Sequence, residues 1–122
     1  MDPQTTLGPE AHWRQALEQG RILLQRDPVD GKCYFPPRLA GPQGQPLEWV
    51  ETSGRGTVYS LTVVSQRPPQ PPYNVALVDL EEGVRMMSRV DAVAPDGAAI
   101  GAAVIAAIAH EPDGPMVVFH PA

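Results

Sequence analysis

The chain has 122 residues, of which 15 are proline, 11 are glycine and one is cysteine, with 43% hydrophobic and 19% charged residues. This length fits one domain, the prolines exclude a helical bundle, and a single cysteine excludes a small secreted fold held by disulfides. Nine lysine and arginine residues against 14 aspartate and glutamate residues give a net charge of −5. That balance disfavours a nucleic-acid partner, because such binding depends on clustered basic residues.

The first ten residues hold two acidic residues, two prolines and no apolar run. A secretory signal needs a basic start and an apolar core, so we expect no secretory signal here and a cytoplasmic protein. The longest apolar stretch, residues 98–109, is shorter than the about 20 residues that span a membrane. We therefore assign it to the folded core.

The first predicted element is a short amphipathic helix over residues 8–20. Pro9 suits a first helical turn, and Gly20 can adopt the left-handed conformation that ends a helix. Trp13, Ala16 and Leu17 fall on one apolar stripe. So short a helix is only marginally stable alone, and we expect it to pack on another element.

Residues 27–46 contain five prolines and three glycines, a density that predicts an irregular segment with fixed turns. Short strands are predicted after it, and the alternation of apolar and polar residues is clearest at 57–65. The predicted strands are residues 47–53, 57–65, 74–81, 84–90 and 116–119.

Three connections between these strands have distinct signals. Ser53-Gly54-Arg55-Gly56 predicts a tight turn or bulge, and Glu82-Gly83 predicts a hairpin. Residues 67–72 hold four prolines and predict a stiff, extended loop, while residues 91–97 predict a turn-rich connection.

Residues 102–110 give conflicting signals. Their alanines favour a helix, whereas the β-branched Val104 and Ile105 and the preceding Gly101 favour a strand. We predict a strand, because the neighbouring elements are strands. The fold class is then mainly β: an N-terminal helix (residues 1–20), an irregular segment (21–46) and a five- to six-stranded barrel of the oligonucleotide- and oligosaccharide-binding (OB) type (47–122).

Several segments also resemble a known family. The two most specific are Phe-Pro-Pro-Arg at 35–38 and Ser-Gly-Arg-Gly-Thr-Val-Tyr-Ser at 53–60. With them, the chain from about residue 13 to 121 resembles the acyl-CoA-associated OB-fold proteins with a zinc ribbon, named DUF35. The remaining similar segments are residues 13–19, 24–26, 48–50, 72–78 and 100–101.

The resemblance implies a ribbon whose four cysteines hold a structural zinc ion. The matching positions here are Asp27, Asp30, Gly41 and Gly44, and none carries a thiol. Two carboxylates and two glycines do not supply the tetrahedral donor set of structural zinc, and Cys33 lies between these positions. We therefore expect a vestigial ribbon without metal. The segment then lacks the roughly 10 kcal/mol that a structural zinc contributes, and prolines replace only part of it.

No residue set predicts catalysis. Cys33 follows Lys32, which would lower the pKa of its thiol slightly, but a nucleophilic cysteine also needs a positioned base. We interpret Cys33 as structural or incidental, and Glu81-Glu82 as a solvated turn. The three histidines, at positions 12, 110 and 120, are interpreted as surface or partner-facing residues.

Two tryptophans and two arginines are the remaining candidates. We expect Trp49 in the core, whereas Trp13 is equally consistent with packing its helix or anchoring an interface. Arg38 and Arg55 suit either a phosphate group of CoA or a structural role at a turn, and the sequence leaves both open.

The resemblance implies a non-catalytic accessory subunit that completes the acyl-CoA channel of a thiolase-superfamily partner, or associates with a hydratase of the hot-dog type. The predicted partner-binding residues are Trp13, Phe35, Pro36 and Pro37, since a proline-rich surface costs little to order. We expect a hetero-oligomer without a cofactor of its own, a nucleic-acid partner or a membrane contact. The alternative is a stand-alone OB domain that binds an acyl thioester or, less favoured, single-stranded nucleic acid, although Tyr59 and Tyr73 have no basic stripe around them.

Overall fold

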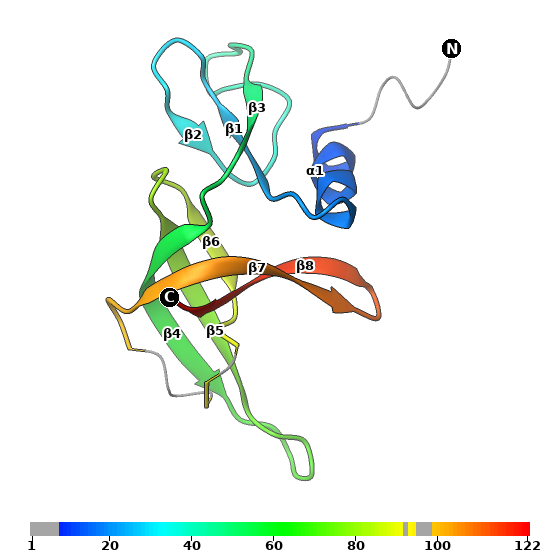
Figure 1. Cartoon of the computed structure of the whole chain (residues 1–122), viewed down its shortest axis with the longest axis vertical. Helices are drawn as coiled ribbons and strands as arrows, with labels where there is room; N and C mark the ends of the chain where they lie inside the picture. Colours follow the sequence, from blue (N-terminus) through cyan, green and yellow to red (C-terminus); the bar gives the residue numbers. More distant parts are fainter. Residues whose placement is uncertain (1–7, 92, 95–98) are drawn as a thin grey trace.

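A computed structural model describes residues 8–91, 93–94 and 99–122. Over these residues the chain forms one helix and eight strands, and the strands make two sheets, a small one of three strands and a larger one of five (Figure 1). The elements are α1 (Pro9–Glu18), β1 (Leu23–Arg26), β2 (Cys33–Tyr34), β3 (Glu48–Glu51), β4 (Arg55–Val64), β5 (Tyr73–Leu80), β6 (Arg85–Ser88), β7 (Ala103–Glu111) and β8 (Gly114–Pro121).

Helix α1 follows the sequence prediction closely. Pro9 lies in its first turn, and Gly20, which follows the C-cap residue Gln19, has a φ of 81°. Ala16 and Leu17 are buried where the helix packs against β1 and β8. The helix is therefore held by its apolar stripe rather than by its own short length.

The small sheet has the order β2-β1-β3, with both neighbours antiparallel to β1. Strand β2 lies inside the segment predicted to be irregular. Strand β3 was expected to be the first strand of the barrel, but it pairs with β1 from Leu23↔Glu51 to Arg26↔Glu48. The alternation of apolar and polar residues predicts a strand but not the strand with which it pairs. The sequence therefore did not predict that β3 pairs with β1. We propose that the small unit extends through β3 rather than ending at residue 46.

The larger sheet has the order β6-β5-β4-β7-β8 and curves into a nearly closed barrel, consistent with an OB fold (Figure 1). A parallel bridge between Val90 and Phe119 joins the segment after β6 to β8. The amide of Asp91 donates to the Phe119 carbonyl at 2.7 Å, and the Phe119 amide donates to the Arg89 carbonyl at 3.0 Å. Within the described residues, no helix has the length and apolar character that a membrane span requires.

Most predicted strands and connections are confirmed. The hairpin between β5 and β6 turns at Gly83, whose amide donates to the Leu80 carbonyl at 2.9 Å. The proline-rich loop joins β4 to β5 at the tip of a long hairpin, where Gln66 Nε2 donates to the Pro71 carbonyl (Figure 1). The predicted connection at residues 91–97 lies largely outside the described residues.

The alanine-rich segment is a strand, as predicted. Strand β7 pairs with β8 from Val104↔Pro121 to Glu111↔Gly114, and its first residues also pair with the start of β4. The pairings with β8 and β4 supply hydrogen bonds to backbone groups of β7 that a helix would have bonded within itself. Tertiary pairing thus overrides the helix propensity of alanine.

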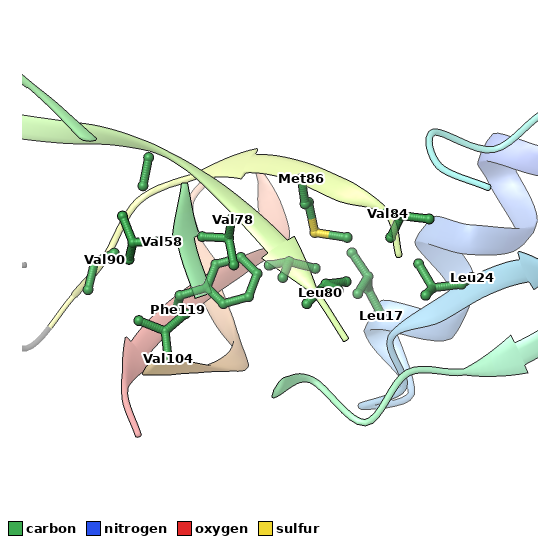
Figure 2. Packing of buried hydrophobic residues seen from close by; sticks show 12 residues of the cluster. Leu17, Leu24, Val58, Val78, Leu80, Val84, Met86, Val90, Val104 and Phe119 are labelled. Carbon is green, nitrogen blue, oxygen red and sulfur yellow. The ribbon is translucent and has the colours of Figure 1, made fainter. Parts of the chain in front are cut away.

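The hydrophobic core is continuous from the barrel to the small unit (Figure 2). Val58, Val78, Val104 and Phe119 fill the barrel, and Phe119 is fully buried. The cluster continues past Leu80 to Leu17 and Leu24, on α1 and β1. The two sheets therefore share buried apolar surface.

Glu82 also joins the two units. Its carboxylate accepts hydrogen bonds from Thr52 Oγ1 at 2.9 Å and from the Ser53 amide at 2.7 Å. The side chain is half-buried, so the expectation of a solvated Glu81-Glu82 turn is wrong for Glu82. It links the β5–β6 turn to the chain that leaves β3.

Candidate functional site

An apolar hollow of about 190 Å³ lies between α1, the segment after β2, and strands β6 and β8. Trp13 is held in its wall because its Nε1 donates to the Leu23 carbonyl at 2.8 Å. The Phe35 ring lies 5.5 Å from the Trp13 ring at an angle of 55°. The lining residues are Trp13, Arg14, Phe35, Met86, Met87, Pro115, Met116 and Val117.

The hollow brings together two of the four predicted partner-binding residues, Trp13 and Phe35. Pro36 is exposed and Pro37 is half-buried, but neither lines it. Sequence reasoning missed Met87, which is 71% exposed. The Met86-Met87 pair could have indicated an exposed methionine, because consecutive residues of a strand face opposite sides and only one of the two can lie in the core. Methionine is flexible and suits an adaptable contact surface.

Arg38 and Arg55 lie on different units. Arg38 follows β2, its guanidinium carbon is 5.0 Å from the centre of the Tyr34 ring, and it borders a hollow of about 240 Å³ that His12 and Trp49 also line. Its backbone amide and carbonyl both bond to the side chain of the buried Gln25, at 2.8 and 2.7 Å. Arg55 is exposed at the start of β4. The structure therefore does not assemble one site from both arginines.

Trp49 differs from its expected place in the core. The side chain is half-buried and stacks on His12, with 4.6 Å between ring centres. The reason is the pairing of β3 with β1, which carries Trp49 away from the barrel interior. Of the other two histidines, His110 is exposed and His120 is half-buried.

Cys33 has the character of a structural thiol. It is half-buried, and burial raises the pKa of the thiol, with the Glu82 carboxylate adding to this rise and Arg26 opposing it. A raised pKa keeps the thiol protonated at neutral pH, contrary to the slight lowering expected from Lys32. Among the described residues, no group of three or more His, Cys, Asp and Glu side chains could hold a metal.

The four positions that match the zinc ligands do not fit a zinc ion. One Asp27 oxygen accepts from the Val29 amide at 2.8 Å, and this bond, with a weaker one from Gln45, holds the pKa of the carboxyl below its usual range against the effect of burial. Asp30 accepts from the Lys32 amide at 2.8 Å. Gly41 and Gly44 offer no side chain, so the donor set is two carboxylates already bonded to the backbone.

Comparison with known proteins places the chain in a family. Residues 49–109 match the family described as ChsH2, C-terminal OB-fold domain. A DUF35 domain-containing scaffold protein of Methanocaldococcus jannaschii is 32% identical over 96 residues, covering 73% of this chain and 68% of that protein. The chain belongs to the DUF35 family. The resemblance found in the sequence is thereby confirmed.

Two solved DUF35 structures have the same fold. The first, from a structure titled Ltp2-ChsH2(DUF35) aldolase, has a TM-score of 0.82 and 33% identity, covering 95% of this chain and 96% of that chain. The second is a DUF35 protein of unknown function from Sulfolobus solfataricus, with a TM-score of 0.64 and 16% identity over 91% of this chain and 83% of that one. At that identity the second likeness shows the fold alone.

Longer enzyme subunits also contain a similar segment. A probable enoyl-CoA hydratase alpha subunit of Thermomonospora curvata is 36% identical over 119 residues, which cover 92% of this chain and 37% of that protein. The 3-oxo-4,17-pregnadiene-20-carboxyl-CoA hydratase alpha subunit of Mycobacterium tuberculosis is 34% identical, covering 99% and 42%. This chain therefore spans about two fifths of the length of these two relatives.

Proposed function

We propose that this DUF35 protein is a non-catalytic accessory subunit that binds an acyl-CoA-handling enzyme of the thiolase superfamily and completes its substrate channel. The observation that carries this proposal is the near full-length match to the DUF35 chain of the Ltp2-ChsH2(DUF35) aldolase. The other relatives are named as CoA hydratase subunits and as a DUF35 domain-containing scaffold protein, which supports an accessory role beside an enzyme that acts on acyl-CoA.

The side chains of the described residues support an accessory role. Burial raises the pKa of the Cys33 thiol, which disfavours the thiolate that a nucleophilic cysteine needs. The apolar hollow at Trp13 and Phe35 instead offers aromatic surface beside the exposed Met87, the composition of a binding hot spot. We propose this hollow as the contact surface for the enzyme partner, together with Pro36 and Pro37, which follow Phe35 in the chain.

Co-expression with a thiolase-like protein of the same host tests the proposal. We expect the two chains to co-elute in size-exclusion chromatography, and Met87→Asp to weaken the complex at least about tenfold, because hot-spot losses reach 2 kcal/mol or more. Ile100→Asp is the matched control, since Ile100 is 74% exposed against 71% for Met87, but lies before β7 outside the hollow.

Two results would contradict the proposal. Wild-type chain that stays monomeric with the thiolase-like protein and itself binds an acyl thioester or single-stranded DNA would support the stand-alone OB domain. If Met87→Asp and Ile100→Asp weakened the complex equally, the hollow would not be the contact surface.

For CoA itself, we propose that Arg38 or Arg55 contacts a phosphate group of the ligand. In the complex, we expect alanine at the contacting position to weaken acyl-CoA binding about tenfold, since hydrogen bonds to charged groups are worth roughly 1.5–3 kcal/mol. Isothermal titration of Arg38→Ala and Arg55→Ala measures this, with Arg67→Ala in the exposed loop after β4 as the control. Unchanged affinity in both variants would leave the arginines with structural roles only.

A further inference from the structure

The vestigial ribbon contains two turns of similar construction but different length. In the first turn, the Gly31 amide donates to the Asp27 carbonyl at 2.8 Å, and Gly31 has a φ of 77°. In the second turn, the Gly44 amide donates to the Gly41 carbonyl at 2.9 Å, and Gly44 also has a φ of 77°. The left-handed glycine thus comes four residues after the start of the first turn and three after the start of the second.

This difference places a left-handed conformation at residue 44, one of the four positions that match the zinc ligands. A residue with a side chain is strained at such a φ. In the first turn, the left-handed residue is Gly31, which follows the matching position Asp30. The left-handed conformation at residue 44 therefore favours glycine there over a residue whose side chain could bind a metal.

The side chain of Gln45 occupies the space next to Gly41. A Cβ atom on residue 41 would lie 2.3 Å from Gln45 Cδ, so the glycine leaves room for this side chain. Gln45 Oε1 accepts from the Gln43 amide at 2.8 Å, which fixes the amide group within its own turn. Its Nε2 then donates to Asp27 Oδ2 in the first turn at 3.2 Å.

Asp27 is a fixed acceptor for this bond. The residue is only 6% exposed, and its other carboxylate oxygen accepts from the Val29 amide at 2.8 Å. Its own backbone closes the first turn, because the Asp27 amide donates to the Lys32 carbonyl at 2.9 Å. The Gln45–Asp27 bond therefore joins two side chains that are each anchored in a different turn.

We propose that this Gln45–Asp27 bond is the cross-link that holds the two ribbon turns together, in the structural place of the zinc ion that the family resemblance implies. Gly41 is part of the device, because only a residue without a side chain admits Gln45. The segment then folds without metal: strand pairing and the Gln25 side chain hold β2 and Arg38 to β1, and the Gln45 amide joins the two turns.

Limited trypsin digestion at Lys32 and Arg38 tests the cross-link, since cleavage there reports how often the segment opens. We expect Gln45→Ala to accelerate cleavage about fivefold, the factor for one lost hydrogen bond of roughly 1 kcal/mol. Gln43→Ala is the matched control, because Gln43 is exposed in the same turn and contributes only its backbone amide to the described hydrogen bonds. Cleavage at Arg85 in the barrel should not change in either variant.

A second variant, at Gly41, should disrupt the same Gln45–Asp27 bond without changing Gln45. Gly41→Ala should displace Gln45 and accelerate cleavage as much as Gln45→Ala does, although Gln45 is still present. The double variant should open no faster than Gln45→Ala alone, since both changes remove one interaction. Additive effects, or a Gln45→Ala variant that behaves like Gln43→Ala, would overturn the proposal.

Elemental analysis of the wild-type protein from zinc-supplemented medium completes the test. We expect far less than one zinc ion per chain after dialysis, and no change in trypsin sensitivity on adding a chelator. Near-stoichiometric zinc, or faster cleavage with chelator, would overturn the proposal. These outcomes are independent of whether an enzyme partner is found.

Discussion

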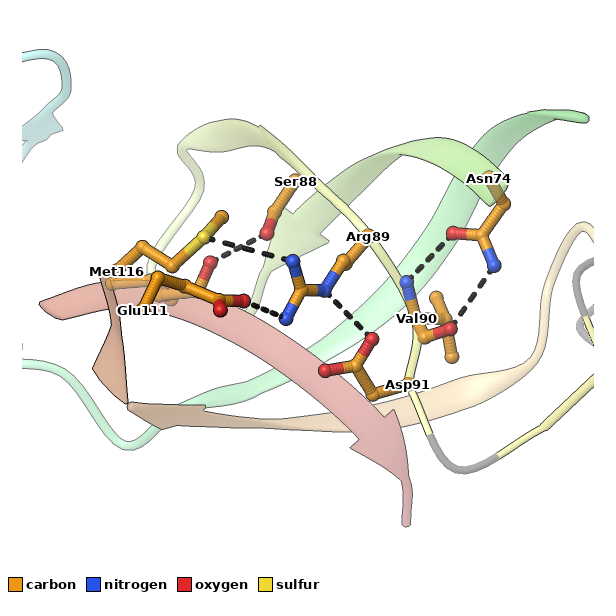
Figure 3. A network of polar contacts seen from close by, with 8 residues as sticks. Asn74, Ser88, Arg89, Val90, Asp91, Glu111 and Met116 are labelled. Atoms are coloured by element: carbon orange, nitrogen blue, oxygen red, sulfur yellow. Dashed lines mark hydrogen bonds and ion pairs between the residues drawn. The ribbon is translucent and has the colours of Figure 1, made fainter. Parts of the chain in front are cut away.

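Replacing Asn74 by alanine is expected to cause the largest loss of stability. Asn74 is buried in β5, its Nδ2 donates to the Val90 carbonyl at 3.0 Å, and its Oδ1 accepts from the Val90 amide at 2.8 Å (Figure 3). Val90 bridges to Phe119 where the barrel closes, so the amide side chain holds the closing segment in place. Alanine would leave both backbone groups of Val90 without these partners.

Each buried polar group left unsatisfied costs about 1–3 kcal/mol, so we expect the free energy of unfolding to fall by at least about 2 kcal/mol. Urea denaturation followed by circular dichroism measures this change. Gln70→Ala is the control, because Gln70 is an exposed amide residue in the loop after β4 and should change stability by less than about 0.5 kcal/mol. An Asn74→Ala variant as stable as Gln70→Ala would show that water or a shifted backbone replaces both bonds.

Gly56→Ala should also destabilise the barrel. A Cβ at residue 56 would lie 2.7 Å from Val78 Cγ1 and 2.9 Å from the Asp79 carbonyl oxygen, on the paired strand β5. The second contact involves backbone, which cannot rotate away as a flexible side chain can. Overpacking of this kind costs about 1–3 kcal/mol, and we expect a lower melting temperature by calorimetry.

Thr57→Ala is the control for Gly56→Ala, since Thr57 is exposed on the neighbouring position of the same strand. It should change the free energy of unfolding by no more than about 0.5 kcal/mol. Equal melting temperatures for the two variants would mean that β4 and β5 separate easily at this point, and that the glycine has another role.

The Ser-Gly-Arg-Gly motif that carried much of the family resemblance is explained by packing at the start of β4. Gly54 has a φ of 79°, and its carbonyl accepts from the Ala106 amide at 2.8 Å where β7 approaches. Gly56 allows close contact with β5. The motif therefore identifies the fold, and its glycines are needed for close strand approach rather than for chemistry.

The candidate site was only partly predictable. Trp13 and Phe35 are predicted from the sequence to bind a partner, and the structure places them in one hollow. Met87 was missed because it is distant in sequence and looks like an ordinary strand residue. The role of Gln45 was also missed, since no sequence pattern shows that a glutamine fills the space beside a glycine.

The strands of the barrel, the N-terminal helix and the membership in the DUF35 family were determined by the sequence alone, because periodicity, proline and glycine positions and motifs are local properties of the chain. The absence of thiols at residues 27, 30, 41 and 44 was equally plain from the sequence. Only the tertiary structure decided that β3 pairs with β1, that Trp49 lies outside the core, and that Gln45 reaches Asp27. These features depend on which distant segments pack against one another. The hydrogen bonds and buried surface that stabilise such contacts involve residues far apart in the sequence, so no local sequence pattern predicts them.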